Sequence, residues 1–175
     1  MTAAGEIREC AGERSRSEGT EMWEELLEAW QINNRINLFL LERIDQKGLA
    51  CTLSKRGGRD VARQFAHMHN NRIDHLRRWT PDLVKGARVF ESKEEPGGDE
   101  LASALTESGE LVSRCIQKAG SGAPVKTFKR GLVVAITYLI SHDSHHRGSI
   151  LLTLKECGQK VDQDTQYGIW DWERR

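Results

Sequence analysis

Histidine supplies the residues with the clearest capacity for chemistry in this chain, and its six copies fall into two groups. The first group lies between residues 67 and 75, and the second lies between residues 142 and 146. The members are His67, His69, His75, His142, His145 and His146. A neutral imidazole binds zinc, nickel, copper or iron through a ring nitrogen. Helix bundles build metal sites from side chains on facing helices, so this distribution predicts a metal site.

The spacing within the second group favours one pair of ligands. Residues four apart on an α-helix differ by about 40° in direction and about 6 Å in height, so their side chains can share an ion. On a helical projection, His142 and His146 flank the apolar stripe, whereas His145 turns toward solvent. We therefore favour His142 and His146. A pair of this spacing also arises by chance or in packing, where hydrogen bonds satisfy the rings.

Four segments with helical periodicity carry or surround these histidines. They span residues 23–44, 59–79, 100–118 and 125–157. Thr20 and Asp99 are expected N-caps, Pro124 suits a first helical turn, and Gly158 marks the end of the last helix. No segment alternates with a period of two residues, so no sheet is expected. The sequence therefore predicts an all-α four-helix bundle.

The two ends of the chain differ in character. Residues 1–19 lack periodicity and are expected to form a mobile tail, which leaves residues 20–175 as a single domain. The segment after Gly158 is rich in aromatic residues, so we expect it to pack back onto the bundle. The five tryptophans are expected to serve the core and this docked segment.

Composition excludes several classes of partner. The 26 basic residues balance the 26 acidic ones, and Arg72, Arg77 and Arg78 are interleaved with acids, which argues against nucleic-acid binding. No apolar run is long enough to span a membrane, and the N-terminus does not resemble a secretory signal. We therefore expect a soluble, cytoplasmic protein. The four cysteines, including Cys10 in the tail, lack metal-binding spacing and are expected to be reduced thiols.

Three stretches of the chain together resemble the DinB-like (DinB/YfiT) family of metal-dependent four-helix-bundle proteins. They are RDVARQFAHMHNNR, YLISHDSHHRGSILLTLKECG and YGIWDW, and the resemblance covers residues 23–172. Family members use three histidines to hold a divalent ion, zinc or nickel in most cases. The matching positions here are His67, His142 and His146. Periodicity instead aligns His69 with the apolar stripe, so His69 remains an alternative to His67, and Ser149 stands where the family usually has glutamine.

The resemblance also implies a function. Some relatives are transferases or isomerases that use low-molecular-weight bacterial thiols, and the family name implies damage-inducible expression. We therefore expect the ion to activate a small thiol toward a small-molecule substrate. A hydrolase that uses a metal-bound hydroxide, with Asp143 or Glu156 assisting as base, is one alternative. A non-catalytic module whose ion staples two helices together is another, and bundles of this size often form homodimers.

Three residues beside the second histidine group have their own expectations. Arg147 resembles the family's arginine and is expected either to bind an anionic substrate or to form a salt bridge with a neighbouring helix. Asp143 is expected on a solvated helix face, with orientation of an imidazole as the alternative. Gly148 costs stability within a helix, which predicts a close approach of another helix there.

Overall fold

The computed structural model describes the backbone of residues 4–175 and the side chains of residues 19–175. Within this range the chain is helical and contains no strand. The helices are α1 (Ala4–Leu41), α2 (Gln46–Leu49), α3 (Val61–Trp79), α4 (Gly98–Gly120), α5 (Leu132–Glu156) and α6 (Gln163–Gly168), followed by a 3-10 turn at Trp172–Arg174. None of the described helices combines the length and the apolar character needed to cross a membrane.

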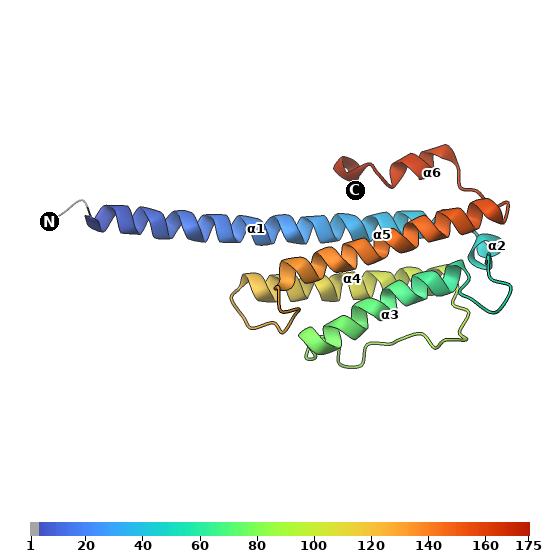
Figure 1. The fold of residues 1–175 in the computed structure, drawn as a ribbon, viewed down its shortest axis with the longest axis horizontal. Helices are drawn as coiled ribbons and strands as arrows, with labels where there is room; N and C mark the ends of the chain where they lie inside the picture. The colour runs from blue at the N-terminus through green and yellow to red at the C-terminus, as the bar shows by residue number, and fades with distance from the viewer. Residues whose placement is uncertain (1–3) are drawn as a thin grey trace.

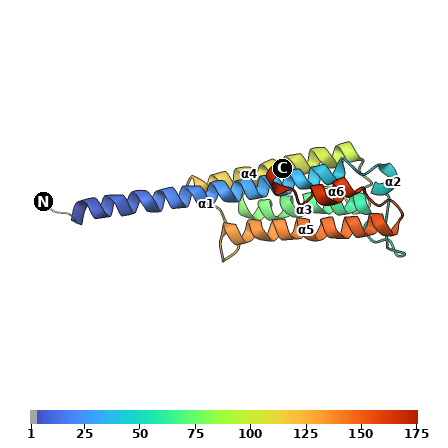
Figure 2. The ribbon, with the colours of Figure 1, turned by 90° about the horizontal axis from the view of Figure 1, so that it is seen from above.

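Four long helices, α1, α3, α4 and α5, form the predicted bundle (Figure 1). The main contacts run from α1 to α4, from α4 to α3, from α3 to α5, and from α5 back to α1. The helices therefore form a ring in which α1 is diagonal to α3, and α4 is diagonal to α5. Figures 1 and 2 show that α1 extends well beyond the other three helices at its N-terminal end.

Two apolar clusters fill the bundle. One lies toward α2 and includes Phe65, Leu101 and Ile150, and the other lies toward the opposite end and includes Trp30 and Ile136. Burial of each large apolar side chain contributes about 1.5–3 kcal/mol relative to exposure. Along each long helix, polar residues that are also buried separate the two clusters. These polar residues lie at the level of the histidines.

Several helix boundaries differ from those that periodicity predicts. Residues 4–19, expected as a mobile tail, continue helix α1, while residues 1–3 and the side chain of Cys10 lie outside the described residues. Gly97, not Asp99, is the N-cap of α4. Helix α5 begins only at Leu132, because Gly131 adopts a φ of 95° and because the amide of Lys126 donates to the carbonyl of Trp79.

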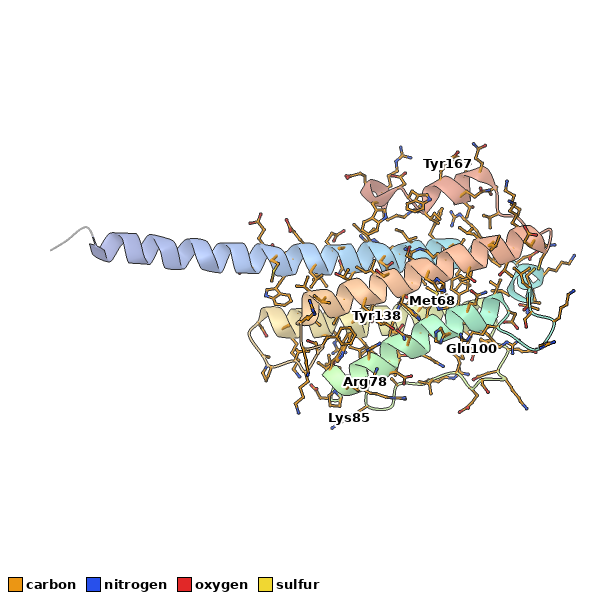
Figure 3. All side chains as sticks on the ribbon, in the orientation of Figure 1. Met68, Arg78, Lys85, Glu100, Tyr138 and Tyr167 are labelled. Carbon is orange, nitrogen blue, oxygen red and sulfur yellow. The ribbon has the colours of Figure 1, made fainter. Side chains whose placement is uncertain are left out.

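The segment after α5 packs back onto the bundle, as predicted, and α6 lies against α1 and α5 (Figures 1 and 2). Ile169 is buried and extends the apolar cluster near α2. The aromatic side chains of this segment are more exposed than expected, with 67% of Tyr167 and 74% of Trp170 accessible to solvent. Figure 3 shows Tyr167 on the outer side of the molecule. Trp170 belongs to the docked segment, as expected, and lines a cavity against α5, although most of its surface is exposed.

Candidate metal centre

Helices α3 and α5 bring three histidines together where they pack. His67 of α3 meets His142 and His146 of α5, and one ring nitrogen of each lies within 4.8 Å of the others. The ring centroids are 5.1 Å apart for His67 and His142, 5.0 Å for His67 and His146, and 4.6 Å for His142 and His146. His145 is exposed, as predicted. The structure thus brings together the three residues that the family resemblance indicated.

Periodicity misplaced the contribution of α3 because this helix has more than one buried face. It is covered by α4 on one side and by α5 on the other. Phe65 and Met68 are directed into the bundle core, whereas His67 lies at the partly exposed edge that faces α5. A helical projection assumes a single core direction, so it cannot identify a residue at the border between two helices.

His69 occupies a different environment from His67. It is buried, its Nδ1 lies 2.8 Å from the carbonyl oxygen of Ala104, and its Nε2 lies 2.9 Å from that of Arg88. Both ring nitrogens therefore face main-chain acceptors, and neither is directed toward the histidine cluster. His69 fastens α3 to α4 and to the connector between them, so the alternative ligand that periodicity suggested does not reach the cluster.

The donor atoms of the cluster fit a divalent ion. Nε2 of His142 lies 3.3 Å from Nε2 of His67, and the buried Nδ1 atoms of His142 and His146 have no hydrogen-bond partner. Burial lowers the pKa of both His67 and His146 to about 4, with a further contribution from the positive charge of Arg59. These two rings are therefore neutral near pH 7. Neutral imidazoles that converge in this way are the ligands that zinc and nickel accept.

A buried polar network supports the cluster from inside the bundle. Asp143 of α5 is fully buried, and its Oδ2 accepts hydrogen bonds from Arg72, Asn33 and Asn37 at 2.7, 2.8 and 2.9 Å. Burial alone would raise the pKa of this carboxyl group, but the charge of Arg72 and the hydrogen bonds hold it at about 2. The expectation that Asp143 lies on a solvated face is wrong, because α1 and α3 supply buried partners for it.

Asp143 also faces the cluster through its second oxygen. Oδ1 has no hydrogen-bond partner and lies 3.9 Å from Nδ1 of His142, which has none either. This distance is too long for a hydrogen bond, but it places the charged carboxylate next to the Nδ1 side of the His142 ring. A carboxylate that accepts a hydrogen bond from Nδ1 leaves Nε2 of the same ring free as a ligand. Asp143 is thus placed to orient His142, the role given above as its alternative.

The contacts of Arg147 and Gly148 differ from the expected salt bridge and the expected close approach of a helix. Nη1 of Arg147 donates to the side-chain oxygens of Asn33 and Asn37, at 2.8 and 2.7 Å, and not to a carboxylate of a neighbouring helix. Arg147 is buried and lines a cavity beside Trp170, not the one beside His67, so its role toward substrate stays a prediction. A Cβ atom at Gly148 would meet nothing within 4 Å, so no helix approaches closely there.

Sequence reasoning missed most of the supporting network. Arg72 was placed in a short basic run, but it is fully buried and is also hydrogen-bonded to Asn34 and Ser108. The available signal was polar residues within otherwise apolar stripes, such as Asn33 and Asn37, which are four residues apart. Their partners are 106 and 110 residues away in the chain, so spacing could not reveal the pairing.

The fold and the cluster define the class of protein. The protein is all-α: its four long helices form a bundle, and two adjacent helices bring three histidines together as a candidate metal site. A comparison with family models matches residues 17–174 to the DinB family, which is nearly the whole chain. The chain belongs to the DinB family. The search among curated proteins found no match.

Proposed function

We propose that this DinB protein binds one divalent ion, zinc or nickel, through His67, His142 and His146. We further propose that it uses the ion to activate a low-molecular-weight thiol in a transferase reaction on a small-molecule electrophile. The observation that carries the proposal is the convergence of three imidazole nitrogens within 4.8 Å at the junction of α3 and α5. A cavity of about 210 Å³ lies directly beside His67 and gives a small molecule access.

The chemistry follows from the number and type of ligands. Three imidazoles leave positions on a divalent ion for an exogenous ligand, whereas a structural site closes the fourth position with protein. A bound divalent ion would lower the pKa of a coordinated thiol, so that the thiolate forms near neutral pH. The chain contributes three imidazole rings, the carboxylate of Asp143 beside His142, and Arg72 to keep that carboxylate charged.

The hydrolase alternative lacks the bases suggested for it. Asp143 is fully buried and is paired with Arg72, so it cannot exchange protons with a substrate in the cavity. Glu156 is the last residue of α5 and lies about 15 Å along the helix from His146. Neither carboxylate can therefore act on a molecule beside the three histidines. A hydrolase would therefore have to rely on a metal-bound hydroxide without help from either carboxylate.

The staple alternative is weakened by the packing of the helices. Helices α3 and α5 are already held together by apolar contacts and by the buried ion pair between Arg72 and Asp143. An ion at their partly exposed edge would add to this packing, which other contacts already supply.

Elemental analysis of the purified, tag-free protein tests the metal site. We expect about one divalent ion per chain in the wild type and loss of that ion in His142→Ala and His146→Ala. His145→Ala is the matched control, because this adjacent histidine is exposed and lies outside the cluster. Retention of the ion in both cluster variants would contradict the proposal. So would absence of metal from the wild type after reconstitution with zinc or nickel.

The thiol part has its own test in the cobalt-substituted protein. Addition of 2-mercaptoethanol should produce an intense near-ultraviolet band from thiolate bound to cobalt, and this band should be absent without the protein. A metal-loaded protein that shows no such band, but melts at a lower temperature after chelation, would contradict thiol activation and would favour the staple.

The expected surroundings of the protein form part of the same proposal. We propose a cytoplasmic homodimer that contacts neither nucleic acid nor membrane. Exposed apolar side chains such as Tyr138, Leu152 and Trp170 are compatible with pairing. Sedimentation of the metal-loaded protein would measure the mass directly, and a monomer at micromolar concentration would contradict the dimer.

A further inference from the structure

The cavity beside His67 has its own walls and its own charges. It lies between the N-terminal end of α3 and the connector from α3 to α4, and its volume is about 210 Å³. Arg59, Arg63 and His67 line the side of α3, and Glu91 and Ser92 line the side of the connector. A molecule that reaches the histidine cluster through this cavity therefore passes two guanidinium groups.

The wall formed by the connector is held in place. The side chain of Asn70 donates to the carbonyl of Phe90 at 2.8 Å and accepts from the amide of Phe90 at 2.9 Å. His69 lies against the carbonyl of Arg88, two residues earlier. These contacts tie the connector to α3 on both sides of Val89. The cavity is thus a preformed site, which reduces the entropic cost of binding a ligand.

Only one of the two guanidinium groups is available to a ligand. Arg63 is paired with the carboxylate of Asp60 at 3.0 Å and also donates to the carbonyl of Gly58. Arg59 forms no ion pair among the described residues, and its side chain is exposed at the cavity. Its positive charge also acts on the cluster, because it lowers the pKa of His67 and of His146 in addition to the effect of burial. Arg59 is thus an unpaired cation close to the proposed metal ligands.

We propose that the cavity beside His67 is a subsite for a carboxylate, which Arg59 binds, and that the thiol used by this protein carries a carboxylate near its sulfur. This inference rests on the proposed function, because it assigns the substrate class of the same site. Glu91 on the opposite wall favours a carboxylate over a group with two negative charges. Arg147, buried against α1, does not line this cavity, so Arg59 takes the anion-binding role expected of Arg147.

Thiols that differ in charge provide the test. Cobalt-loaded protein is titrated with 3-mercaptopropionate, 2-mercaptoethanol and cysteamine, and the thiolate band gives each dissociation constant. We expect 3-mercaptopropionate to bind most tightly and the cationic cysteamine to bind most weakly. In Arg59→Gln the affinity for 3-mercaptopropionate should fall about five- to tenfold, while that for 2-mercaptoethanol should change less than about twofold.

Arg56→Gln is the matched control, because Arg56 is an exposed arginine three positions earlier that does not line the cavity. It should leave all three affinities unchanged. Equal affinities of the wild type for the three thiols would overturn the inference, as would an equal loss for every thiol in Arg59→Gln. These outcomes leave thiol binding intact, so they are distinct from a failure of the proposed function.

A second measurement tests the carboxylate subsite independently of thiol binding. Propionate is titrated into metal-free protein, and the ring resonances of His67 are followed by NMR. We expect these resonances to shift with propionate in the wild type and in Arg56→Gln, and to shift much less in Arg59→Gln. Thiols that fail to bind, together with this pattern, would contradict the proposed function and support the carboxylate subsite. No shift in the wild type would overturn the subsite.

Discussion

Arg72 of α3 and Asp143 of α5 form a fully buried ion pair, with 2.7 Å between Nη2 of the arginine and Oδ2 of the aspartate. The residue before Asp143 is His142, and Arg72 lies slightly more than one helical turn after His67. The pair therefore locks α3 and α5 together at the level where their histidines meet. A charge in the interior is tolerated there because Asn33 and Asn37 of α1 also donate to the same carboxylate oxygen.

Breaking this pair should destabilise the protein strongly. Asp143→Ala leaves the guanidinium of Arg72 buried without a counter-charge, and we expect the free energy of unfolding in urea to fall by about 3–5 kcal/mol. The double variant with Arg72→Met and Asp143→Leu should lose less than Asp143→Ala, because it removes both charges together. A loss below about 1 kcal/mol in Asp143→Ala would show that the pair does not hold the two helices together.

The metal-free protein should lose stability as the pH falls below 6.5. In the folded protein the pKa of His67 and of His146 is about 4, whereas the ordinary value is 6.5. Between these values the unfolded chain binds more protons than the folded one, so acid favours unfolding. The loss of stability that these two rings cause is therefore present below pH 6.5 and absent above it.

Urea denaturation at several pH values, with the metal removed, measures this effect. The decline between pH 6.5 and pH 4 should be shallower in His67→Gln and in His146→Gln than in the wild type, whereas His145→Ala, which removes only a minor influence on His146, should stay close to the wild type. Identical slopes in all four proteins would contradict the lowered pKa values of the cluster.

Two cysteines should react slowly in the native protein. Burial raises the pKa of Cys115 from 9.0 to about 11, and burial together with the neighbouring Cys157 raises that of Cys51 to a similar value. The thiolate is the reactive form, so its fraction at pH 8 falls about a hundredfold, and burial also limits access of the reagent. A time course with a disulfide reagent should show these as slow thiols. Cys115→Ser should remove one slow equivalent, and urea should make every remaining thiol react rapidly.

Two glycines within helices should respond to alanine in opposite ways. Gly148 of α5 is exposed with open space around its Cβ position, so Gly148→Ala should stabilise the protein by up to about 1 kcal/mol. A Cβ at Gly109 of α4 would instead collide with the side chain of Asn34, which accepts a hydrogen bond from Arg72. Gly109→Ala should therefore destabilise by about 1–3 kcal/mol. Melting temperatures of the two variants on opposite sides of the wild type would confirm the prediction.

Local sequence patterns predicted the parts of the site that lie on one helix. The four-residue spacing of His142 and His146 places two imidazoles one turn apart, and the apolar stripe beside them identifies the side that faces the bundle. The same logic identified His145 as exposed. These features depend on helix geometry alone, which is the same in every α-helix.

Features that depend on a second helix were predicted less well. The choice between His67 and His69 depended on how α3 is covered on its two sides, and only the family resemblance favoured His67. The start of α5 was placed too early because apolar periodicity continues through residues 125–131, where Gly131 and the contact of Lys126 with Trp79 interrupt the helix. Periodicity does not register such interruptions.

The sequence by itself determined the helical class, the approximate positions of the four long helices, and the pair His142 and His146 on one of them. Hydrophobic periodicity encodes which face of a helix is buried, and this information is local. Only the tertiary structure decided that Arg72, Asp143, Asn33 and Asn37 form one buried network, and that Arg59 instead of Arg147 lines the cavity beside His67. Polar partners of this kind are chosen by which helices pack side by side, and that arrangement follows from the whole set of buried faces together.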